Sequence, residues 1–106
     1  MLHLDQASFK KEVAEFKGVV LVDFFAHWCP PCKMLSPLLE EMDKENKSSD
    51  VKFAKVDVDV NQELSGQYGV QSIPTVIIFK DGKQVAQKVG FGPKEMYLEA
   101  INSVRK

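Results

Sequence analysis

The sequence predicts one α/β domain in which a mixed, mainly parallel sheet lies between helices. Segments of helical and extended periodicity alternate along most of the chain, and an Asp-Gly pair near the C-terminal end predicts a closing hairpin. One strand, 19–26, is almost continuously apolar, which is typical of a central strand covered on both faces. At 106 residues the chain can bury one core without disulfides or metals. We therefore expect residues 1–106 to form a single domain.

The N-terminal part predicts a helix over 6–17 that leads directly into this strand. Phe9, Val13 and Phe16 recur at helical spacing and form its apolar face. Asp5 can cap the start of the helix, and Gly18 can end it.

A second helix is predicted over 31–47, after the central strand. Its apolar face consists of Leu35, Leu38, Leu39 and Met42. Pro37 lies within this helix and removes one backbone donor, so we expect a kink there. The next segment, 51–58, has the alternation of a strand with at least one buried face.

The C-terminal part predicts a short helix, two strands joined by the Asp-Gly hairpin, and a last helix, at 61–67, 73–79, 84–89 and 94–104. Asn61 can cap the short helix, and Pro74 lies at the opening of the first strand, where its missing N–H is tolerated. Pro93 suits the first turn of the last helix. The apolar positions of that helix are Met96, Leu98, Ile101 and Val104.

The composition is that of an ordinary folded protein, with 44% hydrophobic residues, 27% charged residues and a formal net charge of −1. No basic stripe is present to neutralise phosphates, which argues against nucleic-acid binding. No apolar stretch reaches the roughly 20 residues of a membrane-spanning helix, and the first residues lack the pattern of a secretory signal. We therefore expect a cytoplasmic protein that binds neither nucleic acid nor membrane, although a secreted chain whose signal has been removed would look the same.

Cys29 and Cys32 are the only cysteines, and they lie at the predicted junction of the central strand and the second helix. Two thiols at this spacing can form and reopen a disulfide, which favours redox chemistry over a structural role. A bridge across so short a loop would add little stability. Zinc is the main alternative, because His27 supplies a third ligand, but a structural zinc site needs four and only His3 remains.

Cys29 is the candidate nucleophile of this pair. At the start of a helix its thiolate is stabilised by unpaired backbone N–H groups and by the positive end of the helix dipole. Such placement lowers the pKa of a thiol from about 8.5 towards about 7 or below. A thiolate attacks a disulfide to form a mixed disulfide. Cys32, one turn later and expected to be more buried, would then attack Cys29 and release the reduced partner.

Asp23 interrupts the apolar central strand. A buried carboxylate without a partner is costly and acquires a raised pKa. Asp23 lies six residues before Cys29, so extended geometry allows it to lie beneath the cysteine pair. The alternative is an acid at the edge of the strand that reaches solvent, and the residues themselves leave both possibilities open.

The segment around the cysteines, Val22-Asp23-Phe24-Phe25-Ala26-His27-Trp28-Cys29-Pro30-Pro31-Cys32-Lys33, resembles the active-site segment of the thioredoxin family. Further matches occur in order and at the family's spacing over nearly the whole chain. They are Pro37, Phe53-Ala54-Lys55-Val56-Asp57, Ile73-Pro74-Thr75, Phe79-Lys80-Asp81-Gly82 and Val89-Gly90. The resemblance implies the thioredoxin fold, with a central five-stranded sheet flanked by four helices, and the reduction of disulfides by dithiol–disulfide exchange.

The resemblance also implies roles for residues near the cysteines. The family's counterpart of Asp23 accepts and donates a proton for the buried cysteine, and its counterpart of Lys55 lies near that aspartate and moderates its charge. A surface lysine on a strand is the alternative for Lys55. Pro74 corresponds to a cis-proline whose loop packs beside the disulfide, keeps metals away and offers backbone groups to the substrate. An ordinary trans proline is the alternative there.

Substrates are expected to touch the residues around and between the cysteines. We assign substrate binding to Trp28, Pro30, Pro31, Ile73, Pro74, Gly90 and Phe91. Trp28 could instead be a core aromatic that closes the helix against the sheet, and Phe91 could pack inward.

Pro30 departs from the family pattern, in which the dipeptide between the cysteines is most often Gly-Pro. It fixes φ and deletes an N–H near the Cys29 thiolate, and the direction of its effect on the reduction potential is open. Disulfide oxidases of the bacterial periplasm also carry a proline first, so an oxidase or isomerase is a second hypothesis. A third is a non-catalytic subunit that holds a partner on the surface formed by Trp28, Pro74 and Gly90.

The main hypothesis is a protein-disulfide reductase that maintains cell redox homeostasis. We expect it to act on disulfide-containing proteins as a monomer, without a bound cofactor or metal. The chain shows no nucleotide motif of its own. By resemblance, its dithiol is regenerated by a separate thioredoxin reductase that draws on NADPH or ferredoxin.

Overall fold

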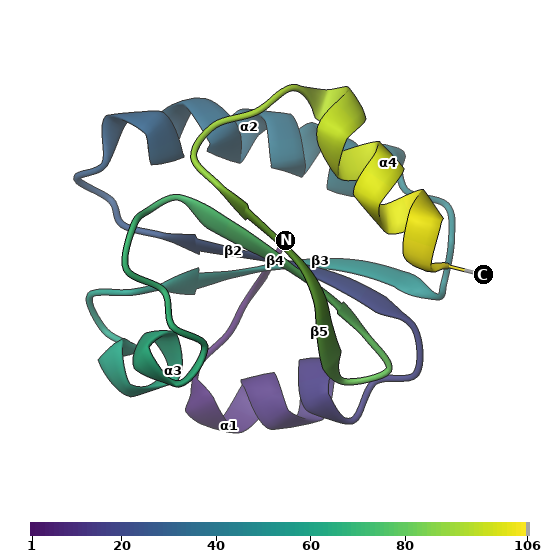
Figure 1. Cartoon of the computed structure of the whole chain (residues 1–106), viewed down its shortest axis with the longest axis horizontal. Coiled ribbons are helices and arrows are strands. Elements are labelled where there is room, and N and C mark those ends of the chain that lie inside the picture. Colours follow the sequence, from purple (N-terminus) through teal and green to yellow (C-terminus); the bar gives the residue numbers. More distant parts are fainter. Residues whose placement is uncertain (106) are drawn as a thin grey trace.

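A five-stranded sheet with helices on both faces organises the computed structural model, which describes residues 1–105 (Figure 1). In chain order the elements are β1 (Leu2–His3), α1 (Gln6–Phe9), the π-helical segment η1 (Lys10–Ala14), β2 (Val19–Phe25), α2 (Pro30–Glu45), β3 (Val51–Asp57), α3 (Gln62–Gln67), β4 (Thr75–Lys80), β5 (Lys83–Val89) and α4 (Lys94–Val104). The fold class is therefore the expected one. Periodicity did not reveal β1, because two residues are too few to show a pattern.

The strands are ordered β1-β3-β2-β4-β5, with β2 at the centre. The pairs β1–β3 and β2–β3 are parallel, whereas β2–β4 and β4–β5 are antiparallel. The sheet is mixed, as predicted, but it is not mainly parallel. The connection through α3 returns the chain so that β4 runs against β2, and the hairpin adds a second antiparallel pair.

The two faces of the sheet are covered by different helices. Figure 1 shows α2 and α4 on one side, and α1 and α3 on the other. Because side chains alternate along a strand, β2 sends Val20, Val22 and Phe24 towards α1 and α3, and Val19 and Leu21 towards α2 and α4.

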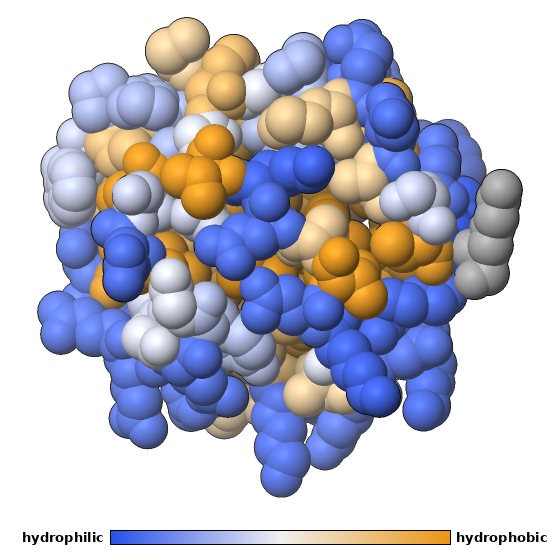
Figure 2. Space-filling view, in the orientation of Figure 1, coloured by the Kyte–Doolittle hydropathy of each residue, from blue (hydrophilic) through white to orange (hydrophobic). Residues whose placement is uncertain are grey.

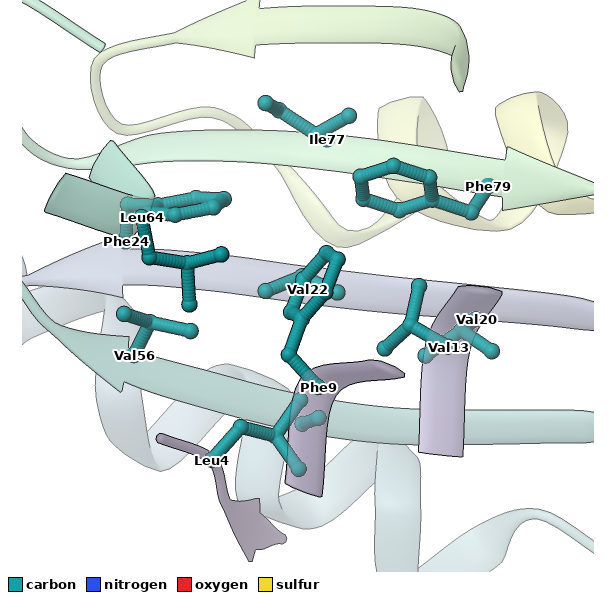
Figure 3. Packing of buried hydrophobic residues seen from close by; sticks show 11 residues of the cluster. Leu4, Phe9, Val13, Val20, Val22, Phe24, Val56, Leu64, Ile77 and Phe79 are labelled. Carbon is teal, nitrogen blue, oxygen red and sulfur yellow. The ribbon is translucent and has the colours of Figure 1, made fainter. Parts of the chain in front are cut away.

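The core on the side of α1 and α3 is shown in Figure 3, where side chains from β2, β3 and β4 meet Phe9 and Val13. Phe9 packs edge-on against Phe79, with ring centroids 5.5 Å apart. Burial of such side chains stabilises the fold by about 1.5–3 kcal/mol each.

The core on the opposite side joins α2 and α4 to the sheet. Leu35, Leu39 and Met42 of α2 are buried there, as predicted, and so is Ile101 of α4. Tyr97 is fully buried and was not predicted, whereas Leu98, predicted to lie on the apolar face, is exposed. The buried face of α4 therefore centres on Tyr97 and Ile101, which are four residues apart and lie on one side of the helix.

The first helix differs from the uniform α-helix predicted over 6–17. Asp5 caps it as expected, in a reciprocal pair with Ser8. After Phe9 the backbone widens into η1, where the N–H of Glu15 donates to the carbonyl of Lys10 at 3.0 Å. The wider turn leaves Val13 fully buried, whereas Phe16 lies at the margin of the core beneath the ammonium of Lys52.

Several element ends also differ from the prediction by one or two residues. Helix α2 begins at Pro30 and ends at Glu45 rather than spanning 31–47, and Pro37 lies inside it. The strand expected from 73 begins at Thr75. Asn61 occupies the N-cap position of α3, but its side chain donates to the carbonyl of Asp57 at 3.0 Å instead of capping the helix.

The β4–β5 turn confirms the Asp-Gly signal, since Asp81 and Gly82 have φ values of 52° and 84°. A Cβ at Gly82 would also collide with the carbonyl oxygen of Ala14, so both the positive φ and the lack of space require glycine at this position.

Figure 2 shows a mostly hydrophilic surface on the viewed face, with apolar residues in small separate patches. Among residues 1–105, no helix combines the length and apolarity that crossing a membrane requires.

Candidate active site

The two cysteines lie at the junction where the central strand passes into α2. Cys29 is the N-cap residue of α2, with extended backbone angles, and Pro30 and Pro31 are the first two helical residues. Proline is suited to these positions, because its missing N–H would have no helical partner anyway. The backbone N–H of Cys32 donates to the Sγ of Cys29 at 3.2 Å. A sulfur in this position receives both a hydrogen bond and the positive end of the helix dipole.

Cys29 and Cys32 are joined in a disulfide, with their Cα atoms 5.2 Å apart. From the sequence we expected Cys32 to be more buried than Cys29. In the disulfide state the two are buried alike, since Cys29 is 3% exposed and Cys32 is 2% exposed. Phe25 and Ala26 pack beside them, and Ile73 and Val58 contact the same cluster. The apolar surroundings cover both sulfurs.

Asp23 is fully buried, so the alternative of an acid that reaches solvent is wrong. On β2 it follows Val19 and Leu21 at strand spacing and therefore faces α2 and α4. Neither carboxyl oxygen has a hydrogen-bond partner within residues 1–105. Burial raises the pKa of Asp23 to about 7, and the positive charge of Lys55 only partly offsets this.

Lys55 is the neighbour of Asp23 in the parallel register of β2 and β3. It is only 7% exposed, so the alternative of a surface lysine is wrong. Its ammonium donates to the Oγ of Ser36 at 3.1 Å and lies 4.4 Å from the ring centroid of Phe25. Lys55 thus lies beside Asp23 in the sheet, and its ammonium reaches Ser36 of α2.

The loop before β4 packs against the disulfide. The Ile73–Pro74 peptide bond is cis, so the trans alternative is wrong. The carbonyl oxygen of Ile73 lies 3.8 Å from the Sγ of Cys29, and the N–H of Gly90 donates to the carbonyl of Pro74 at 2.8 Å. Pro74 itself is buried, whereas Ile73 and Gly90 are half-buried. The side chain of Pro74 therefore shapes the loop and offers little surface of its own.

An exposed apolar rim surrounds this loop and the cysteines. Trp28 is 65% exposed, so its alternative as a core aromatic is wrong, and Phe91 is also exposed rather than packed inward. Pro30 and Pro31 are exposed as well. The indole N–H of Trp28 donates to Oδ2 of Asp59 at 2.8 Å, which fixes the orientation of the ring.

His27 contacts an acid and an aromatic ring. Its Nε2 lies 3.3 Å from Oδ2 of Asp57, and its ring packs edge-on against Phe25. Over residues 1–105, no group of three or more His, Cys, Asp or Glu side chains is placed to hold a metal ion. The arrangement around the cysteines thus favours a disulfide over zinc coordination.

The sequence reasoning missed two polar residues that act on this site. Asp59 orients Trp28, and Ser36 binds the ammonium of Lys55. Ser36 follows Cys32 by four residues, so helical spacing could have placed it on the same side of α2. Nothing local in the sequence links Asp59 to Trp28, because the contact spans 31 positions.

A closely spaced disulfide at the N-terminus of a helix, after a central strand and beside a cis-proline loop, defines the class of thiol–disulfide oxidoreductases. The family model described as Thioredoxin matches residues 1–103. The thioredoxin of Bacillus subtilis (strain 168) is 54% identical over 95 residues, covering 90% of this chain and 88% of the relative. The thioredoxin of Rickettsia felis is 46% identical over 100 residues, covering 94% of each chain.

A solved structure agrees with these relatives. A single-substitution mutant of the thioredoxin from Halobacterium salinarum NRC-1 superposes with a TM-score of 0.88 at 37% identity, covering 99% of this chain and 90% of that one. The chain belongs to the thioredoxin family. It is a thiol–disulfide oxidoreductase with protein-disulfide reductase activity, and the disulfide between Cys29 and Cys32 is its redox-active group.

Proposed function

We propose that Cys29 is the nucleophile that attacks disulfides in other proteins, and that Cys32 resolves the resulting mixed disulfide. The observation that carries this assignment is the position of Cys29 as the N-cap of α2, with its Sγ accepting the N–H of Cys32. In the reduced protein the same hydrogen bond and the helix dipole favour the thiolate of Cys29 over its thiol. Cys32 lies inside the helix and has no comparable donor at its sulfur among the hydrogen bonds of residues 1–105.

The exchange balances in two steps. The Cys29 thiolate attacks one sulfur of the substrate disulfide, a Cys29–substrate disulfide forms, and the other substrate sulfur leaves as a thiolate. The Cys32 thiolate then attacks the Sγ of Cys29, the mixed disulfide breaks, and the Cys29–Cys32 disulfide forms. Two electrons have passed to the substrate, whose second sulfur also leaves as a thiolate.

Asp23 is proposed to take the proton that Cys32 loses before the second step. It faces the layer that contains α2, and no partner within residues 1–105 occupies its carboxyl oxygens. With a pKa of about 7, it can hold or release a proton near neutral pH. Lys55 moderates its charge from the neighbouring strand.

Substrate binding is proposed at the exposed and half-buried residues around the disulfide. Trp28, Pro30, Pro31, Phe91, Ile73 and Gly90 form this rim, and Pro74 holds the loop in place. Apolar contact area around a reactive sulfur favours the binding of extended, partly unfolded segments over charged surfaces.

We also propose the cellular setting of the reaction. A separate thioredoxin reductase, dependent on NADPH or ferredoxin, would return the disulfide to the dithiol. Residues 1–106 would act as one domain and as a monomer on disulfide-containing proteins of the cytoplasm, in the maintenance of cell redox homeostasis. Membership of the thioredoxin family supports these proposals.

Insulin reduction driven by dithiothreitol tests the assignment of the two cysteines. We expect Cys29→Ser to lose the activity, and Cys32→Ser to lose turnover while accumulating a mixed disulfide with insulin. Mass spectrometry of the trapped species should locate the bond at Cys29. Turnover that survives in Cys29→Ser, or a bond trapped at Cys32 in the reciprocal variant, would overturn the assignment.

A further inference from the structure

Among residues 1–105, the ammonium of Lys55 forms no ion pair with the carboxylate that lies beside it in the sheet. In the parallel register of β2 and β3, Asp23 and Lys55 are direct neighbours, and adjacent strands are only about 4.8 Å apart. Both side chains are buried, so an ion pair between them would be the expected arrangement. Yet the ion pairs of residues 1–105 do not include this one, and both oxygens of Asp23 are without a partner.

Two groups hold the ammonium in its observed place. The Nζ of Lys55 donates to the Oγ of Ser36 at 3.1 Å, and it lies 4.4 Å from the ring centroid of Phe25. The hydroxyl supplies a hydrogen bond, and the ring supplies a cation–π contact. The hydrogen bond is the more directional of the two, because it needs an oxygen at one position.

Ser36 is placed to do this by the helix that carries the cysteines. It lies four residues after Cys32 and therefore on the same side of α2. A cavity of about 120 Å³ is lined by Cys32, Lys33, Ser36 and Lys55, together with Phe25, Ala26 and His27. The ammonium thus lies at a cavity that reaches Cys32.

We propose that Ser36 is a positioning residue, which holds the Lys55 ammonium at the cavity beside Cys32 and off the Asp23 carboxyl. Two consequences follow for the second step of the exchange. The positive charge favours the thiolate of Cys32. Asp23, without a direct ion pair, keeps its raised pKa and can accept the proton from Cys32. The inference rests on the proposed proton role of Asp23.

Other titratable and charged groups surround these two side chains. They come from β1, the segment before α1, the β2–α2 loop, α2, β3 and α4, and are His3, Asp5, His27, Cys32, Lys33, Asp57 and Tyr97. Burial raises the pKa of the Tyr97 phenol and the negative charge of Asp23 adds to this shift, so Tyr97 lies within electrostatic reach of Asp23. A substitution at Ser36 leaves all of these groups in place, so a change in titration reports the position of Lys55.

The test compares Ser36→Ala with Ser36→Thr, which keeps a hydroxyl at the same position. The measurement is the titration midpoint of the Asp23 carboxyl by carbon NMR in the oxidised protein. Without the hydroxyl, Lys55 can turn to Asp23, and we expect the midpoint to fall by about 1 pH unit. The Thr variant should stay within about 0.3 pH units of the wild type. Alanine is the better helix former, so Ser36→Ala should fold.

Lys55→Met supplies the control, because it removes the charge that Ser36 is proposed to hold. In the Lys55→Met background, Ser36→Ala should leave the Asp23 midpoint unchanged. The proposal is overturned if Ser36→Ala alone lowers the midpoint by less than about 0.3 pH units, or raises it. It is also overturned if the same fall occurs without Lys55.

The pH profile of the exchange rate separates this proposal from the proposed role of Asp23. Ser36→Ala should shift the acidic limb of the profile in the same direction as the NMR midpoint. If Asp23→Asn leaves the profile unchanged, the proton role fails, whereas the NMR titrations still decide whether Ser36 positions Lys55.

Discussion

Changing Asp23 to Asn should stabilise the folded protein, and the gain should depend on pH. Asn has nearly the shape of a protonated aspartic acid but never carries the charge that burial penalises. In the wild type, the buried carboxyl binds its proton more tightly than the same carboxyl in the unfolded chain, because its pKa is about 7 instead of 3.8. The unfolding free energy of the wild type must therefore fall as pH rises from about 4 to about 7, and then level off.

The size of the effect follows from the two pKa values. One pH unit corresponds to about 1.4 kcal/mol, so the gap between 3.8 and about 7 is worth about 4 kcal/mol. At pH 8 we expect Asp23→Asn to be more stable than the wild type by about that amount, and near pH 4 the two proteins should be nearly equal. This is a large share of the total stability of a small domain.

Urea unfolding of the oxidised proteins between pH 4 and pH 9 measures the difference directly. Glu63→Gln serves as the control, since it removes an acid from an exposed position on α3. A stability difference between Asp23→Asn and the wild type that does not vary with pH would refute the reasoning. So would a variant that is less stable than the wild type at pH 8.

Three further predictions concern the helix start, the core and the rim. Pro30→Gly should change the reduction potential, measured against glutathione, by less than about 30 mV. The reason is that the N–H that reaches the Sγ of Cys29 belongs to Cys32 and not to residue 30. A larger change would show that the proline acts on the sulfur in another way. Leu39→Ala removes a fully buried side chain and should lower the free energy of unfolding, measured in urea, by about 2–5 kcal/mol. A loss below about 1 kcal/mol would contradict the packing of α2 on the sheet. Phe91→Ala removes an exposed ring and should lower kcat/KM for insulin about fivefold, which is equivalent to about 1 kcal/mol of apolar contact. The rate of reaction with a small disulfide should not change. Equal losses on both substrates would place the ring outside the binding surface.

Most of the fold could be predicted because its elements carry strong local patterns. The apolar run of β2 indicated the centre of the sheet, and the Asp-Gly pair fixed the β4–β5 turn. The direction of β4 could not be predicted, because it depends on how α3 and the loop before Thr75 return the chain. The burial of Tyr97 in place of Leu98 depends on the rotation of α4 about its axis, which apolar spacing alone did not resolve.

Part of the candidate active site could likewise be predicted from local sequence patterns, and part could not. Asp23 was recognisable as an acid inside an apolar strand, and the spacing of the cysteines indicated redox chemistry. The contacts of Ser36 with Lys55 and of Asp59 with Trp28 join residues 19 and 31 positions apart, so only the folded chain brings them together. The similar burial of the two cysteines arises from packing by Ile73 and Val58 and has no local signal either.

The most direct test of the account is the rate at which each cysteine of the reduced protein is alkylated as pH changes, with the modified site identified by mass spectrometry. We predict that Cys29 reacts first and that its rate rises with an apparent pKa well below about 8.5, the value of a free thiol. Preferential modification of Cys32, or an apparent pKa for Cys29 at or above about 8.5, would contradict it.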